Sequence, residues 1–111
     1  MKYVLLMISD YGEWQNMTPE QAETFDKQIT AFNDELRRSE AFVSAAGLDE
    51  PARTVGFSGG SARVEDGSFA KTREKLAGFW TVSVPDLDVA VDWARKAPLA
   101  NGAIEVRPIV E

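Results

Sequence analysis

Apolar residues fill the first strand-length segment of the chain without alternation. Residues 2–8 are a short apolar run, and a run of this kind predicts a strand. Successive side chains on a strand point to opposite faces. Tyr3, Leu5 and Met7 therefore share one face, and their neighbours share the other: Val4, Leu6 and Ile8. The predicted strand is apolar on both faces.

The pattern then changes to a helical period. Thr18, Pro19 and Gln21 form a helix start. Thr18 is the cap and Gln21 completes a capping box with it, while Pro19 takes the first helical position. The apolar residues that follow recur at spacings near three and four, which predicts one long helix that ends at Gly47. Its stripe consists of Ala22, Phe25, Ile29, Phe32, Leu36 and Val43.

Two short strands are predicted at 52–57 and 62–65, on either side of Ser58-Gly59-Gly60-Ser61. Gly-Gly between two such runs predicts a hairpin turn. A phosphate-binding loop would need a helix directly after the glycines, and no helix is predicted there. We therefore interpret this segment as a hairpin.

The last third of the chain predicts a strand, a helix and a strand. Residues 78–84 form the first strand, whose shared face carries Trp80, Val82 and Val84. Asp86 then caps a helix that Pro98 closes. The inward stripe of this helix is Leu87, Ala90, Val91 and Ala94. Residues 104–110 form the last strand, and Pro108 predicts an edge position because proline cannot donate to a strand ladder.

The order of elements predicts the fold class. It is β-α-β-β-β-α-β, or β-α-β-β-α-β with an added hairpin, in a single domain over residues 1–111. Two helices on one face of a mostly antiparallel sheet form the ferredoxin-like α+β plan.

The apolar first strand predicts a partner for this sheet. An antiparallel sheet with helices on one face normally presents polar residues on the other. About five uncovered apolar side chains, at roughly 1.5–3 kcal/mol each, would forfeit on the order of 10 kcal/mol of burial. We expect a homodimer in which two sheets meet about a two-fold axis. The alternative is that loops, or residues 9–17, cover this face.

Composition narrows the chemistry. The 111 residues include no Cys and no His, so disulfides and thiol nucleophiles are excluded and the commonest metal ligand and general base are absent. We expect no metal site and no cofactor. The net charge of −6 argues against nucleic acid as a partner. The apolar runs are too short for a membrane span and show no signal peptide, so we expect no membrane partner and a cytoplasmic protein.

The turn after the predicted hairpin gathers polar residues and an aromatic, and we interpret it as the rim of a pocket. Asp66 is either a proton acceptor or hydrogen-bond anchor in a cleft, or simply the turn residue of Asp-Gly. We expect Phe69 in the core rather than stacked on a ligand. Arg73 and Glu74 either bind an anionic ligand and position a proton, or form a solvated pair.

Other candidates lie on the strands. Glu105 and Arg107 share one face of the last strand. A charge pair that faces into a barrel would be costly and therefore functional, whereas one that faces water would not be. We expect Tyr3 and Trp80 to line the space between two sheets, with the Trp80 N–H available to a ligand. Tyr11 and Trp14 lie on residues 9–17, which read as a long loop, either a lid or a mobile surface segment.

Several short motifs, in their order and spacing, resemble the YCII-related proteins of the DGPF branch. They are Met1-Lys2-Tyr3, Thr18-Pro19-Glu20, Asp66-Gly67-Ser68-Phe69, Thr72-Arg73-Glu74, Gly78-Phe79-Trp80, Pro85-Asp86-Leu87-Asp88 and Glu105-Val106-Arg107-Pro108. The resemblance implies a ferredoxin-like fold and a dimeric α+β barrel. Ser68 stands where the family has proline, which loosens the turn, and Lys71 stands where the family often has an acid.

The resemblance implies two kinds of function. Barrels of this type include cofactor-free isomerases, dehalogenase-like enzymes and monooxygenases; here Asp66 or Glu74 would move a proton while Arg73 or Arg107 holds an anionic group. The His–Asp pair suspected of catalysis in some relatives cannot operate without His. Genes of the family often lie beside extracytoplasmic-function sigma factors, which implies a regulatory setting, and the acidic charge suits a basic protein partner. We favour a small-ligand-binding or regulatory module, with a cofactor-free isomerase, lyase or dehalogenase-like enzyme as the alternative.

Overall fold

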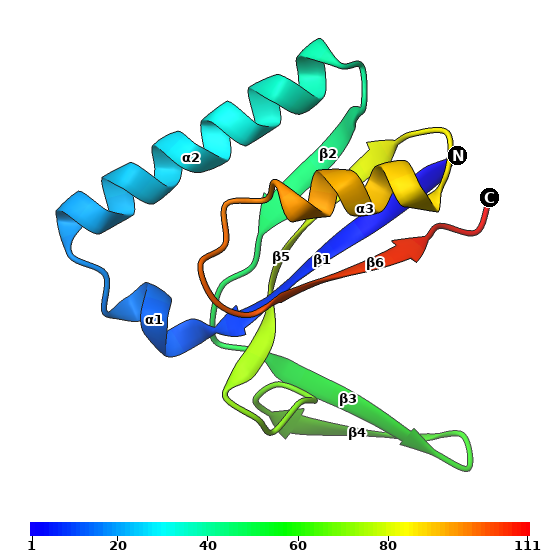
Figure 1. Cartoon of the computed structure of the whole chain (residues 1–111). Helices are drawn as coiled ribbons and strands as arrows, with labels where there is room; N and C mark the ends of the chain where they lie inside the picture. Colours follow the sequence, from blue (N-terminus) through cyan, green and yellow to red (C-terminus); the bar gives the residue numbers. More distant parts are fainter.

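The structure, a computed structural model, describes residues 1–111 (Figure 1). Strands β2, β5, β1 and β6 form, in that order, a four-stranded antiparallel sheet, and β3 and β4 form a separate two-stranded sheet. The chain is of the α+β class, as predicted. The elements are β1 (Lys2–Asp10), α1 (Tyr11–Gln15), α2 (Pro19–Arg38), β2 (Phe42–Gly47), β3 (Arg53–Ser58), β4 (Ser61–Asp66), β5 (Glu74–Ser83), α3 (Leu87–Arg95) and β6 (Ala103–Pro108).

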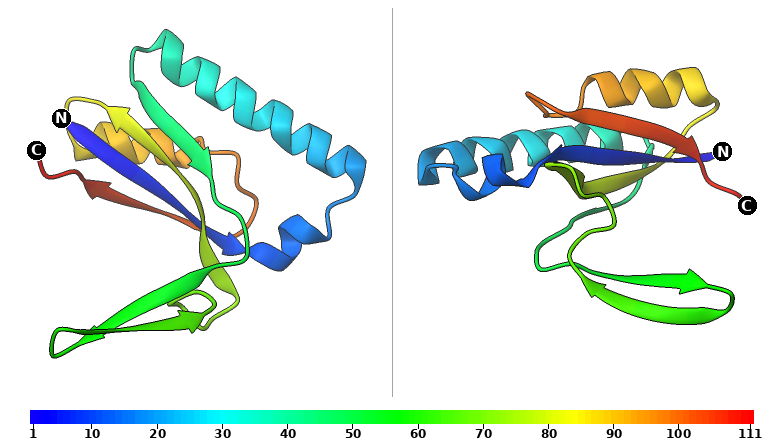
Figure 2. Two further views of the ribbon diagram at one scale, coloured as in Figure 1. Left: turned by 180° about the vertical axis from the view of Figure 1, so that it is seen from behind. Right: turned by 90° about the horizontal axis from the view of Figure 1, so that it is seen from below.

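The helices and the hairpin lie on opposite sides of the four-stranded sheet. The view from below shows α3 above the sheet and the β3–β4 hairpin below it (Figure 2). α2 meets α3 on the helix side, where the rings of Phe32 and Trp93 lie 6.2 Å apart. We call the side away from the helices the open face. Tyr3, Leu5 and Met7 of β1 are buried on the helix side, whereas the residues between them are half-buried on the open face: Val4, Leu6 and Ile8. The prediction that β1 is apolar on both faces is confirmed.

The start of α2 is confirmed. Thr18 Oγ1 accepts a hydrogen bond from the Gln21 N–H at 3.1 Å, and the Gln21 side chain accepts one from the Thr18 N–H at 3.0 Å. Together they satisfy two N–H groups that the first helical turn leaves without partners. Phe32 and Leu36 of the predicted stripe are buried in the core.

The predicted end of this helix at Gly47 is wrong, because α2 ends at Arg38 and residues 42–47 form strand β2. The Glu40 N–H donates to the Arg37 carbonyl at 3.0 Å, and the Ala41 N–H donates to the Leu36 carbonyl at 2.9 Å. This pair of bonds is a Schellman motif, in which glycine usually occupies the left-handed position. Here Glu40 occupies it with φ 60°, so residue type carries no stop signal.

The prediction of a hairpin between the strands on either side of Gly59-Gly60 is confirmed. Ser58 pairs with Ser61, and Gly59 and Gly60 have φ of 55° and 85°. Two left-handed residues in a two-residue loop match the right-handed twist of the flanking strands, and only glycine adopts both at little cost.

The segment 9–17 is not a loop throughout, because Tyr11–Gln15 form helix α1. Asp10 caps it by accepting the Gly12 N–H at 2.9 Å. The indole N–H of Trp14 donates to Ser9 Oγ at 2.7 Å, so the helix is tied to the end of β1. A single helical turn lies below the length that an apolar period can reveal in sequence.

The last elements follow the sequence with one correction. Asp86 caps α3 by accepting the Val89 N–H at 3.0 Å, and β6 is an edge strand, as Pro108 predicted. The predicted stripe of α3 is partly wrong, because Leu87 is exposed. The side chains that pack into the core from this helix are Val89, Ala90, Trp93 and Ala94.

Candidate functional site

A pocket of about 420 Å³ lies between α1, the first half of α2 and the adjoining ends of β2 and β5. Eleven of its 15 lining residues are hydrophobic. The lining residues are Met7, Tyr11, Trp14, Phe25, Asp26, Ile29, Asn33, Ala45, Ala46, Gly47, Leu48, Ala77, Gly78, Phe79 and Trp80. We call it the α1–α2 pocket.

The sheet side of this pocket is lined by small residues, which leave space above the strands. Ala45, Ala46 and Gly47 come from β2, and Ala77 and Gly78 come from β5. A Cβ atom on Gly78 would lie 2.9 Å from the Ala46 carbonyl oxygen and 3.3 Å from Met7 Cε. Such contacts are closer than packed atoms tolerate, so the approach of β2 to β5 requires glycine at position 78.

Aromatic side chains form the other walls. The rings of Trp14 and Phe25 lie 4.4 Å apart between centroids, at 58° to each other, and join α1 to α2. Trp80 packs edge-on against Phe32 at 5.2 Å. Tilted and edge-on arrangements are the favourable geometries for aromatic pairs. The pocket is therefore walled by rings whose positions are set by packing.

Few polar groups reach the pocket. The indole N–H of Trp80 donates to Asn33 Oδ1 at 2.7 Å, while the amide nitrogen of Asn33 makes no hydrogen bond within the chain and is free to donate. The carboxylate of Asp26 is exposed at the rim and forms no ion pair. No Lys or Arg lines the pocket.

Tyr11 connects α1 to the segment that follows β2. Its hydroxyl donates a hydrogen bond to the carboxylate of Asp49. This bond raises the pKa of Tyr11, because the neutral phenol is the donor, and the nearby negative charge acts in the same direction. It lowers the pKa of Asp49, and a bond from the Glu50 N–H adds to the effect. The contact therefore ties a lining residue of the α1–α2 pocket to the segment after β2.

A comparison with protein families decides what the chain is related to. The model of the YCII-related domain matches residues 1–111. The chain belongs to the YCII-related family. It is also 32% identical over 114 residues to an uncharacterized protein of Rhizobium meliloti (strain 1021), an alignment that covers 98% of this chain and 92% of the relative. No helix of this YCII-related chain combines the length and the apolar character needed to cross a membrane.

Of the site residues predicted from sequence, Trp80 lines the α1–α2 pocket, as do Tyr11 and Trp14 of the segment predicted to be a loop. Tyr3 and Trp80 are each 4% exposed and lie in the core on the helix side of the sheet. The expectation that they line a space between two sheets is therefore wrong. The Trp80 N–H is also not available to a ligand, since Asn33 accepts it.

The predicted turn cluster lies elsewhere. Asp66 ends β4 and pairs with Arg53 at 3.5 Å, and its side chain is 93% exposed. Phe69 is 86% exposed, so the expectation that it belongs to the core is wrong for the single chain. Arg73 contacts Asp10 at 2.9 Å, and both line a groove together with Glu74 that has no hydrophobic residue in its lining. These candidates do not converge on one pocket.

Glu105 and Arg107 lie on the open face, as cross-strand neighbours of Leu6 and Val4. They share a face, as predicted, and form an ion pair at 3.7 Å. Both side chains are more than half exposed in the single chain. Nowhere in the chain do three or more potential metal-binding side chains cluster.

Sequence reasoning missed most of the α1–α2 pocket. Its sheet side depends on β2, which was assigned to the helix, and one wall depends on α1, which was assigned to a loop. One usable signal was present. Asn33 follows Phe25 and Ile29 at helical spacing, so it is a polar residue within an apolar stripe.

Proposed function

We propose that this YCII-related chain is a small-ligand-binding module whose ligand occupies the α1–α2 pocket. The observation that carries the proposal is the combination of size and lining. A volume of about 420 Å³, mostly apolar walls and a few polar groups are the features of pockets that bind small organic molecules. The aromatic walls provide apolar contact area for a ligand, while the polar groups of Asn33 and Asp26 would fix its orientation.

Ligand binding without a catalysed reaction has better support than catalysis. Proton transfer needs a group positioned within hydrogen-bond reach of the ligand. Asp66 and Glu74, the acid–base candidates, do not line the α1–α2 pocket, and neither do the anion-holding candidates Arg73 and Arg107. The enzyme alternative therefore rests on the polar groove beside Asp10, which has no apolar wall to hold a substrate.

The extent of the surface supports a homodimer. The chain exposes 7719 Å², whereas a compact monomer of its mass, 12.2 kDa, exposes roughly 6,100 Å². The difference of about 1,600 Å² per chain lies in the range of permanent interfaces. The radius of gyration of 15.7 Å likewise exceeds the roughly 13 Å expected for this length.

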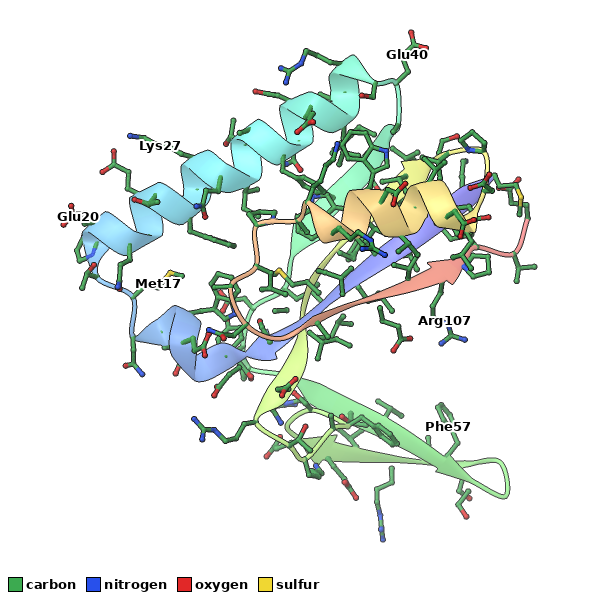
Figure 3. All side chains as sticks on the ribbon, viewed as in Figure 1. Met17, Glu20, Lys27, Glu40, Phe57 and Arg107 are labelled. Carbon is green, nitrogen blue, oxygen red and sulfur yellow. The ribbon has the colours of Figure 1, made fainter.

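The apolar surface that a second copy would cover lies on the open side of the sheet. Val55 and Phe57 of β3 share one face of the hairpin with Val64 of β4, and they are 49%, 76% and 62% exposed. Figure 3 shows Phe57 near the tip of the hairpin, and Arg107 extends from β6 on the same side of the molecule. A two-fold pair would bury this hairpin face and the half-buried residues of β1 together. The strand order and the helices on one face support the ferredoxin-like plan and the dimeric α+β barrel.

A regulatory role agrees with this proposal. The motifs around Asp66 and Pro85 favour the DGPF branch, and with it a role in sigma-factor regulation in the cytoplasm. A ligand sensor needs a pocket and a protein-binding surface, and the net charge of −6 suits a basic partner.

The test of the proposed function is binding of an uncharged aromatic alcohol, phenylbutanol. Trp14 and Trp80 line the pocket, so occupancy should change tryptophan fluorescence. Ala45→Leu places extra carbon atoms in the pocket and should abolish the change. Ala31→Leu makes the same substitution at an exposed residue of α2, outside the pocket lining. This matched control should leave the fluorescence change intact. Equal binding by wild type and Ala45→Leu would remove the pocket from the proposal.

A further inference from the structure

We propose that the α1–α2 pocket selects organic cations, namely ammonium ions attached to an apolar or aromatic body. This inference rests on the proposed function, because it concerns the ligand of the same pocket. It follows from three properties of the lining: aromatic faces, an unpaired carboxylate at the rim, and the absence of any cationic side chain.

The aromatic faces favour a cation. Tyr11, Trp14, Phe25 and Trp80 contribute rings from α1, α2 and β5. The face of an aromatic ring carries negative partial charge and attracts a cation that lies over it, most strongly for tryptophan. Trp14 and Phe25 pack at 4.4 Å with a tilt of 58°, so their ring positions are held without a ligand. An ammonium group that enters here exchanges water for ring faces.

The charges of the lining act in the same direction. Asp26 is the charged residue of the lining and has no ion-pair partner. Lys27, beside it in sequence, pairs with Glu23 at 3.4 Å and points away from the sheet (Figure 3). Asp49 accepts the hydrogen bond of the Tyr11 hydroxyl, so a second carboxylate lies beside one residue of the lining. An anionic ligand would meet the Asp26 carboxylate and no cationic side chain in the lining, so the lining favours a cation over an anion.

The spacing of the polar groups constrains the length of the ligand. Asp26 and Asn33 are seven residues apart on α2, so they lie on one side of the helix about 10 Å apart along its axis. The free amide N–H groups of Asn33 suit a neutral acceptor such as a hydroxyl or carbonyl oxygen. The ligand therefore has its cation at the rim beside Asp26 and its body along the rings toward Trp80.

Three probes with one body and different end groups test the inference: phenylbutylamine, phenylbutanol and phenylbutyrate. At neutral pH they are cationic, neutral and anionic. Affinities are measured by tryptophan fluorescence and calorimetry with the full chain. We expect the amine to bind about three- to tenfold more tightly than the alcohol, and the carboxylate to bind most weakly. Salt should reduce the preference for the amine, since Asp26 is exposed.

Two matched variants assign the preference to the rim carboxylate. Asp26→Asn should remove the difference in affinity between the amine and the alcohol. Asp34→Asn makes the same change of net charge on an exposed residue of α2 that does not line this pocket, and it should keep the preference. If the alcohol binds as tightly as the amine, or if Asp26→Asn retains the preference, the cation inference is wrong and the pocket stands. If no probe binds, or Ala45→Leu leaves binding intact, the proposed function fails with it.

Discussion

The indole N–H of Trp80 donates a hydrogen bond of 2.7 Å to Asn33 Oδ1, and this contact joins the centre of β5 to the middle of α2. Trp80 is 4% exposed and is the cross-strand partner of Leu5 on the neighbouring strand β1. Both residues line the α1–α2 pocket. The bond uses the oxygen of the Asn33 side-chain amide, so its N–H groups remain available to donate.

Loss of this acceptor should destabilise the protein. Asn33→Leu leaves the buried Trp80 N–H without a partner, at a cost of about 1–3 kcal/mol in the free energy of unfolding. The measurement is urea denaturation of Asn33→Leu, Trp80→Phe and the double variant. Because Trp80→Phe removes the donor, adding Asn33→Leu to it should cost markedly less than adding it to wild type. Additive effects would show that the hydrogen bond contributes little.

The bond between Tyr11 and Asp49 makes stability depend on pH in a defined direction. The pKa of Asp49 is lowered by the Tyr11 hydroxyl, so this contribution is fully present above the ordinary carboxyl value and is lost as pH falls through the lowered one. The pKa of Tyr11 is raised by the same bond, so its contribution is lost as pH rises through that raised value. The contact is therefore complete in the window between them.

Tyr11→Phe tests this assignment. It should return the pKa of Asp49 toward its ordinary value of 3.8, as measured by an NMR titration of the carboxyl carbon. The difference in stability between wild type and Tyr11→Phe should be present at neutral pH and vanish in strong acid. Tyr3→Phe is the matched control, since Tyr3 contacts Met1 and not Asp49. An Asp49 titration unchanged by Tyr11→Phe would contradict the contact.

Glu40 occupies a left-handed conformation with φ 60°. This conformation is unfavourable for any residue that has a Cβ atom, whereas glycine adopts it without that cost. Glu40→Gly should therefore stabilise the protein by roughly 0.5–1 kcal/mol, after allowance for the larger backbone entropy of glycine in the unfolded chain. Ser39→Gly is the control, because Ser39 has φ −88° and glycine gains nothing there. In thermal denaturation, Glu40→Gly should raise the melting temperature and Ser39→Gly should lower it.

The proposed dimer predicts a change of assembly when charge is placed on the apolar hairpin face. Phe57→Asp should convert a dimer into monomers in sedimentation velocity, because a buried unpaired carboxylate is costly. Ser61→Asp adds the same charge to the opposite, polar face of this hairpin and should leave the dimer intact. Wild-type protein that sediments as one chain at high micromolar concentration would overturn the proposal.

Elements with local signals could be predicted from the sequence. The Thr18 capping box, the Gly59-Gly60 turn and the Asp86 cap each satisfy their own backbone through neighbours in sequence. The apolar run of β1 predicted a strand with two apolar faces, and the structure confirms it. Such signals are legible because the interactions behind them span only a few residues.

The α1–α2 pocket had no such signal. α2 ends at Arg38 because Ala41, the residue after the left-handed Glu40, is buried in the core and bonds back to Leu36. β2 exists because its backbone pairs with β5, more than thirty residues later in the chain. The pocket forms where these long-range pairings bring Ala45, Gly78 and Trp80 against Trp14 and Phe25.

The amino-acid sequence by itself determined the class of the fold, the apolar strand β1, the caps at Thr18 and Asp86, the Gly59-Gly60 turn, and a chemistry without His or Cys. Only the tertiary structure decided where α2 stops, that 42–47 is a strand, and which side chains surround a ligand-sized space. The physical reason is the range of the forces. Caps and turns are settled between near neighbours, whereas a pocket depends on packing between segments that the sequence keeps far apart.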